Sequence, residues 1–82
     1  MSKHRTTKRE FQAILVRLTE QAFDLPREQA EYYLKVAPPP ESARRVASAL
    51  WLKKAPETED TEALRFQLLA LEQDGQFDFE TE

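Results

Sequence analysis

The sequence predicts an all-α protein, a small single-domain bundle of about four short helices with charged tails. The 82 residues include a single glycine, which leaves few positions for the tight turns of a hairpin-rich β fold. The common residues, among them Ala, Leu and Glu, are strong helix formers. Apolar residues also recur at spacings of three and four, and prolines divide this periodicity into separate segments.

The first helix is predicted over residues 7–23. It begins at Thr7 and Glu10, a Thr-x-x-Glu capping box in which each side chain can reach the backbone amide of the other residue. One apolar face follows at helical spacing: Phe11, Ile14, Leu15, Leu18 and Ala22, widened by Val16 and Phe23. The helix should end before Leu25-Pro26, because the residue before a proline avoids the α conformation.

The second helix is predicted over residues 26–37. Pro26 suits its first turn, since the missing N–H would be unpaired there anyway, and Asp24 is a candidate cap. The inward face consists of Ala30, Tyr33, Leu34 and Ala37. The helix must end at residues 38–40, because three consecutive prolines remove three backbone donors and favour an extended chain.

The third helix is predicted over residues 41–54. Its apolar arc consists of Ala43, Val46, Ala47, Leu50 and Trp51. Lys53 and Lys54 fall in the predicted last turn, where positive charge is favoured by the negative end of the helix dipole. The break at Ala55-Pro56 separates this helix from the next one.

The fourth helix is predicted over residues 58–74. Its first turn is rich in acids, the sign that the helix dipole prefers there: Glu59, Asp60 and Glu62. The apolar residues that follow are Leu64, Phe66, Leu68, Leu69 and Leu71. Gly75 is well placed to end the helix, because glycine readily adopts the left-handed conformation that closes many helices.

Charge is concentrated at the two ends of the sequence. Residues 1–6 are predicted as a basic, flexible N-terminal tail and residues 76–82 as an acidic C-terminal tail, on either side of a helical domain over residues 7–75. The first nine residues contain no acid and the last eleven contain no base. Helix stability explains neither concentration, which leaves solubility, pairing of the two tails or a binding partner.

The composition disfavours catalysis and metal binding. The only histidine, His4, lies in the predicted tail, and the chain has no cysteine and no glycine-rich loop, so no nucleophile and base can be matched. Residues 74–80 resemble the second half of an EF-hand loop, but both anchoring carboxylates are missing. We therefore expect no enzyme activity, no cofactor and no metal site. The lack of cysteine and of a long apolar run predicts a soluble cytoplasmic protein without a membrane partner.

The best-supported function is protein binding. Four short helices cannot easily bury all the large aromatic residues, and aromatic and arginine side chains are enriched at interface hot spots. Tyr32 and Tyr33 point about 100° apart on a helix, so both can be buried only if that helix is covered on two sides. The candidate contact residues are Tyr32, Tyr33, Arg44, Arg45, Trp51, Phe77 and Phe79. We expect an accessory inhibitor, adaptor or regulator, of the kind that bacteria, phages and plasmids encode, with a homodimer as a further possibility.

The aromatic residues of the C-terminal tail allow two interpretations. Phe77 and Phe79 alternate with acids, a pattern that can dock as a linear motif or add a strand to the sheet of a partner. Alternatively, Phe77 folds back onto the helices and the acids keep the end soluble.

The alternative function is nucleic-acid binding through a basic N-terminal arm and the third helix. The residues that would contact phosphates are Lys3, Arg5, Lys8, Arg9, Lys53 and Lys54. Two observations count against it: a net charge of −3 is too mild for generic nucleic-acid binding, and the acidic tail would repel a phosphate backbone. The three-proline turn also fits a helix-turn-helix poorly.

Overall fold

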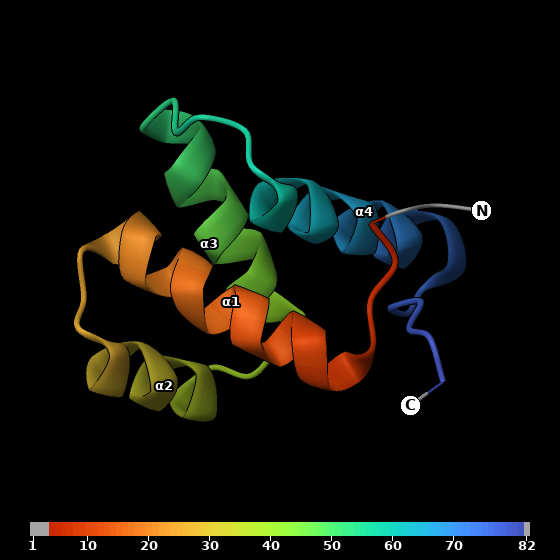
Figure 1. The fold of residues 1–82 in the computed structure, drawn as a ribbon, viewed down its shortest axis with the longest axis horizontal. Helices are drawn as coiled ribbons and strands as arrows, with labels where there is room; N and C mark the ends of the chain where they lie inside the picture. The colour runs from red at the N-terminus through yellow and green to blue at the C-terminus, as the bar shows by residue number, and fades with distance from the viewer. Residues whose placement is uncertain (1–3, 82) are drawn as a thin grey trace.

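The computed structural model describes residues 4–81, and in this range the chain forms four helices, of which three pack against the first. In chain order they are α1 (Lys8–Phe23), α2 (Arg27–Val36), α3 (Glu41–Leu52) and α4 (Glu59–Asp74). Figure 1 shows α2 on one side of α1 and α3 and α4 on the other; α3 also packs against α4. The all-α prediction is confirmed, and the described residues form no β-strand.

Two of the helices, α1 and α4, begin at reciprocal side-chain caps. The hydroxyl of Thr7 accepts a hydrogen bond from the Glu10 amide at 3.1 Å, and the Thr7 amide donates to the Glu10 carboxylate at 3.0 Å. Thr58 and Thr61 form the same reciprocal pair at the start of α4, with bonds of 3.2 and 2.8 Å. Gly75 ends α4 with a φ of 78°, as its position in the sequence predicts.

Asp24 does not cap α2, contrary to the prediction. It ends α1 in the left-handed conformation, with a φ of 54°, and its amide donates to the carbonyl of Glu20. A short polar side chain tolerates this conformation better than most, which explains an aspartate where glycine is more usual. The second helix therefore begins at Arg27, after Pro26, without a side-chain cap.

The third helix ends at Leu52, two residues before its predicted end. Lys54 has a φ of 55°, which breaks the helix. The Lys53 ammonium donates to the carbonyl of Gln21 at 2.7 Å and lies 3.6 Å from the Asp24 carboxylate. This lysine therefore stabilises the negative end of α1 and not, as predicted, that of its own helix.

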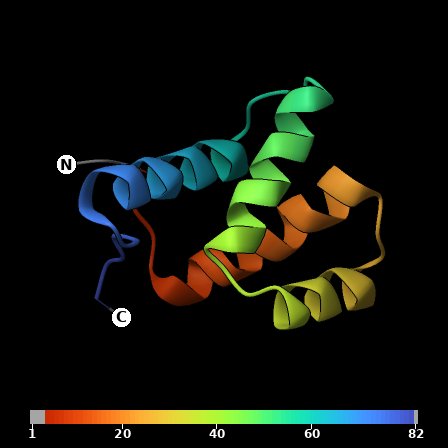
Figure 2. The ribbon, with the colours of Figure 1, turned by 180° about the vertical axis from the view of Figure 1, so that it is seen from behind.

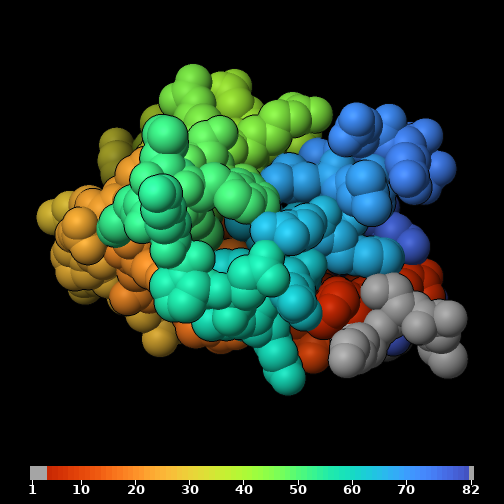
Figure 3. Space-filling view, turned by 90° about the horizontal axis from the view of Figure 1, so that it is seen from above, coloured from red at the N-terminus to blue at the C-terminus, as the bar shows by residue number. Residues whose placement is uncertain are grey.

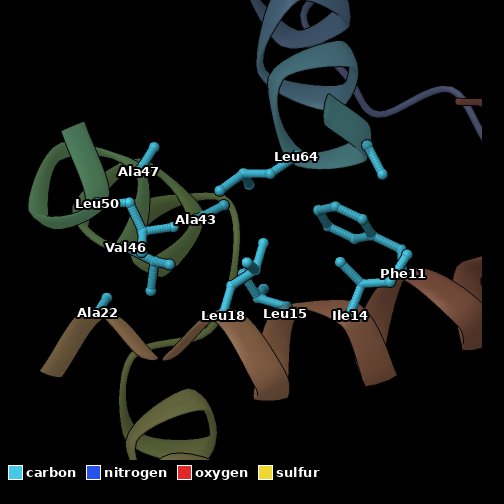
Figure 4. Close-up of a cluster of buried hydrophobic side chains, with 11 residues drawn as sticks. Phe11, Ile14, Leu15, Leu18, Ala22, Ala43, Val46, Ala47, Leu50 and Leu64 are labelled. Carbon is cyan, nitrogen blue, oxygen red and sulfur yellow. The ribbon is translucent and has the colours of Figure 1, made fainter. Parts of the chain in front are cut away.

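The core lies between α1, α3 and α4, and the inward faces predicted for the first and third helices are confirmed except at their ends. Figure 4 shows the side chains of α1 and α3 pointing toward one another, with Leu64 of α4 closing the space between them. The buried set is Phe11, Ile14, Leu15, Leu18, Ala22, Ala43, Val46, Ala47, Leu50, Ala63 and Leu64. Trp51, placed on the same arc by its spacing, is 46 % exposed, and Phe23 is also exposed.

The second helix is covered on one side only. Of its residues, Ala30 alone is fully buried, Tyr33 and Leu34 are half-buried, and Tyr32 is 68 % exposed. The two adjacent tyrosines therefore differ in burial, as expected for a helix that packs through a single face.

The described parts of the two predicted tails run side by side. The Glu80 amide donates to the carbonyl of Thr6 at 2.8 Å, and Thr7 and Glu80 form an isolated parallel bridge. The Arg5 guanidinium contacts the Asp78 carboxylate at 3.1 Å and donates to the carbonyl of Phe79 at 3.0 Å. Figures 1 and 2 both show the first described residues (red) beside the last ones (blue).

Pairing of the two tails, one of the three explanations that the sequence leaves for their charge, is therefore present between residues 4–6 and 76–81; Lys3 lies outside the described residues. Contacts between aromatic rings hold the C-terminal segment in this place. The Phe77 and Phe79 rings lie 5.2 and 5.7 Å from that of Phe11 and 5.5 Å from each other, so the segment packs on the core. Phe77 thus folds back onto the helices, the second of the two interpretations.

Candidate protein-binding surface

An open groove lies between α2 and α3, which both pack against α1. We call it the α2–α3 groove and define it by its lining residues, Phe23, Leu25, Tyr33, Arg44, Arg45, Ser48, Ala49 and Leu52. The Phe23 and Tyr33 rings meet edge to face, with centroids 5.3 Å apart, and form its aromatic wall. One side of the groove is therefore aromatic, and the other side is formed by residues of α3.

The α3 side of the groove follows from the spacing of residues along that helix. Arg45, Ala49 and Leu52 lie at i, i+4 and i+7, so they share one face, turned away from the buried face of α3. Leu52, the last residue of α3, is 85 % exposed, so most of its side chain is available at the groove. Together with the two aromatic rings it forms an apolar surface. Contact with apolar side chains of another protein would remove this surface from water, which is favourable.

Arg44 and Arg45 provide the only charges among the lining residues of the groove. Arg45 pairs with Glu41 one turn earlier, at 3.1 Å. The guanidiniums of Arg5, Arg17, Arg27 and Arg65 also pair with carboxylates. Arg44 pairs with none of the carboxylates in residues 4–81, although it is exposed on α3. The α3 N-terminal end of the groove is therefore cationic, and its other end, near Leu52, is apolar.

A second hollow lies on the opposite side of α3, against α4. Arg44 and Ser48 line both depressions, and Trp51, Leu68 and Glu72 line the second one. Figure 3 shows α3 (green) exposed between α1 and α2 (orange to olive) and α4 (blue). The Arg65 guanidinium lies over the ring of Trp51, with its Cζ 5.2 Å from the ring centroid, and both residues line a separate hollow between the end of α3 and α4.

The structure separates the seven residues predicted to form one protein-binding surface. Tyr33, Arg44 and Arg45 come together in the α2–α3 groove, whereas Trp51 lies on the α4 side of α3. Tyr32 is exposed but lines neither hollow, and Phe77 and Phe79 are half-buried against Phe11.

Five groove residues were not among the candidates: Phe23, Leu25, Ser48, Ala49 and Leu52. Phe23 ends the apolar face of α1, so the sequence assigns it to the core. Leu52 follows Trp51 at the end of α3, and its spacing from Arg45 was the one signal that pointed to a second face.

Within residues 4–81, which exclude Lys3, the residues of the nucleic-acid alternative lie at two separate places. Arg5 is engaged by Asp78, and Lys53 by the C-terminal end of α1. Lys8 and Arg9 lie in the first turn of the same helix. Because α1 rises 1.5 Å per residue, Arg9 and the Gln21 carbonyl bound by Lys53 are about 18 Å apart along the helix. Lys54 is exposed next to Lys53.

One ion pair joins two helices away from the groove. The Arg17 guanidinium donates to both oxygens of Asp60, at 2.9 and 3.0 Å, and joins α1 to α4. These hydrogen bonds raise the pKa of Arg17 above its usual value. Within residues 4–81 no cluster of three or more His, Cys, Asp or Glu side chains is placed to hold a metal ion. In that range there is also no helix with the length and apolarity needed to cross a bilayer.

No protein-family model, curated protein or solved structure matches this chain. A proposal about its function therefore depends on the residues of the groove.

Proposed function

We propose that this chain is a small, non-enzymatic protein-binding module that holds a partner protein in the α2–α3 groove. The observation that carries the proposal is one open groove that combines an exposed leucine, an aromatic pair and Arg44, which pairs with no carboxylate of residues 4–81. Aromatic and arginine side chains dominate binding energy at protein interfaces, where they fill desolvated pockets surrounded by weaker contacts.

The walls of the groove are fixed by the core, which favours binding. Ala43, Val46 and Leu50 bury the opposite face of α3, and Ala30 anchors α2 on α1. A preformed groove loses little conformational entropy on binding, so more of the contact energy appears as affinity.

A module of this kind acts by occupying or bridging the surface of its partner. An accessory inhibitor, adaptor or regulator of bacterial or phage origin suits the small size of the chain. The absence of cysteine suits the reducing cytoplasm. A second copy of the chain is the alternative occupant of the groove, and the experiment below distinguishes it by the mass of the adduct.

Photocrosslinking in the native host tests the proposal. The photoreactive residue p-benzoylphenylalanine would replace Tyr33 in the groove and, as a matched control, Leu69, an exposed apolar residue of α4 that does not line the groove. We expect position 33 to give a discrete adduct with a partner protein and position 69 to give none. Equal adducts from both positions, or no adduct from position 33, would contradict the proposal, and an adduct of twice the mass of the chain would indicate a homodimer.

A further inference from the structure

We propose that the occupant of the α2–α3 groove is an amphipathic helix of the partner that carries carboxylate side chains in its first turn and apolar anchors after it. This inference rests on the proposed function and goes further, because it specifies the chemistry and direction of the partner segment. It follows from the charge of the groove, the absence of a strand edge in it and the length of its apolar part.

The charge of the groove requires an acidic complement. Arg44 is exposed at the rim and pairs with no carboxylate in residues 4–81, whereas Arg45 is already satisfied by Glu41. Glu72 lines the hollow on the other side of α3, beyond Arg44, and does not pair with it. Arg44 is therefore the position at which a carboxylate of the partner gains most, since a bidentate arginine–carboxylate contact adds both attraction and orientation.

The walls of the groove favour a helical partner over an extended one. An extended peptide gains most of its affinity from backbone hydrogen bonds to the free edge of a sheet. The groove is bounded by α2 and α3, whose backbone groups are already paired within the helices, and its lining residues include no strand. Side chains of the partner must therefore make the contacts, which is the way an amphipathic helix binds in a groove.

The length of the groove sets the spacing of the anchors. Arg45 and Leu52 are seven residues apart on α3, which corresponds to about 10 Å along the helix axis. A partner helix lying along α3 covers the same distance from i to i+7, and a residue at i+4 lies on the same face about 6 Å along the axis. The anchors would contact Leu52 and the ring of Phe23 at the apolar end of the groove.

The direction of the partner helix follows from its dipole. Acidic side chains are stabilising in the first turn of a helix, where the dipole is positive, and destabilising in the last turn. The partner helix can therefore present carboxylates to Arg44 without loss of its own stability if they lie in its first turn. Its N-terminus then lies beside the N-terminal end of α3. We infer that the partner helix runs parallel to α3.

Selection from a display library of random 16-residue peptides, with the full chain immobilised, tests this inference. Wild type should enrich peptides with Asp or Glu near the N-terminal end and apolar residues at i, i+4 or i+7. Binding of the enriched peptides should weaken at least tenfold for Arg44→Glu and recover when their acids are replaced by lysine. Arg27→Glu, on an exposed arginine outside the groove, is the matched control and should bind as wild type does.

The outcomes separate the inference from the function on which it rests. Enriched peptides that require Leu52, as shown by loss of binding to Leu52→Gln, but lack acids or alternate at i and i+2 would overturn the acidic helix and leave the groove as the binding surface. Enriched peptides that bind Leu52→Gln as well as wild type would overturn both proposals. Circular dichroism of each variant shows whether its helices are intact.

Discussion

The buried side chain of Gln67 forms two hydrogen bonds with the backbone of Asp78. Its amide nitrogen donates to the Asp78 carbonyl at 2.8 Å, and its oxygen accepts from the Asp78 amide at 2.8 Å. Gln67 is fully buried on α4, so its polar atoms need these partners. A carboxamide carries one donor group and one acceptor, which match the backbone C=O and N–H of a single residue, and here it pairs with Asp78 as a neighbouring strand would.

This pair of bonds explains how the two ends of the chain reach the core. With Asp78 held by Gln67, the rings of Phe77 and Phe79 pack beside Phe11, and the side chain of Asp78 is available to Arg5. Residues 76–81 therefore have a structural role, and the proposed binding surface, the α2–α3 groove, shares no lining residue with them.

Replacing Gln67 with alanine should lower the free energy of unfolding by about 3 kcal/mol. The substitution removes the hydrogen-bond partners of the Asp78 backbone N–H and C=O and leaves a space in the core. Each of these effects is destabilising. Urea denaturation followed by circular dichroism measures the change. Gln73→Ala, an exposed glutamine on the same helix, is the control and should change stability by less than about 0.5 kcal/mol. Equal effects of the two substitutions would show that the Gln67–Asp78 bonds contribute nothing.

Replacing Gly75 with alanine should cost about 1 kcal/mol of stability through backbone strain alone. Gly75 has a φ of 78°, and no atom lies within 4 Å of the position that a Cβ would occupy, so packing does not oppose the substitution. The left-handed conformation itself is unfavourable for a residue with a Cβ. Asparagine tolerates it better, and Gly75→Asn should lie between glycine and alanine in thermal unfolding. An alanine variant as stable as the wild type would rule out this account of the end of α4.

The predicted helices succeeded where local chemistry decides the structure. The capping box of Thr7 and Glu10 and the glycine at position 75 act within one turn of chain, so they can be recognised from sequence alone. Asp24 and Lys53 were assigned to the wrong helices for the opposite reason. Lys53 caps α1 because the end of α3 lies against it, and no periodicity in the sequence reports that contact.

The pairing of the ends and the groove are tertiary features as well. Gln67 is three residues after Leu64 and four before Leu71, so its inward position could have been read from the spacing, but its partner on Asp78 could not. Tyr33, Arg44 and Arg45 are three of the predicted contact residues, and the groove that they line exists because α2 packs on α1 and stands apart from α3.

The most direct test of the claim that the groove binds a partner is titration calorimetry. The partner protein identified by crosslinking at position 33 would be titrated into the wild-type chain and into two matched variants. Leu52→Gln changes an exposed leucine inside the groove, and Leu69→Gln changes an exposed leucine outside it. Burial of a leucine in an interface is worth about 1.5–3 kcal/mol, and 1.4 kcal/mol corresponds to about tenfold in Kd. We predict that Leu52→Gln weakens binding at least tenfold and that Leu69→Gln changes Kd by less than about twofold, with both variants folded. Wild-type affinity in Leu52→Gln, or equal losses in the two variants, would contradict the claim.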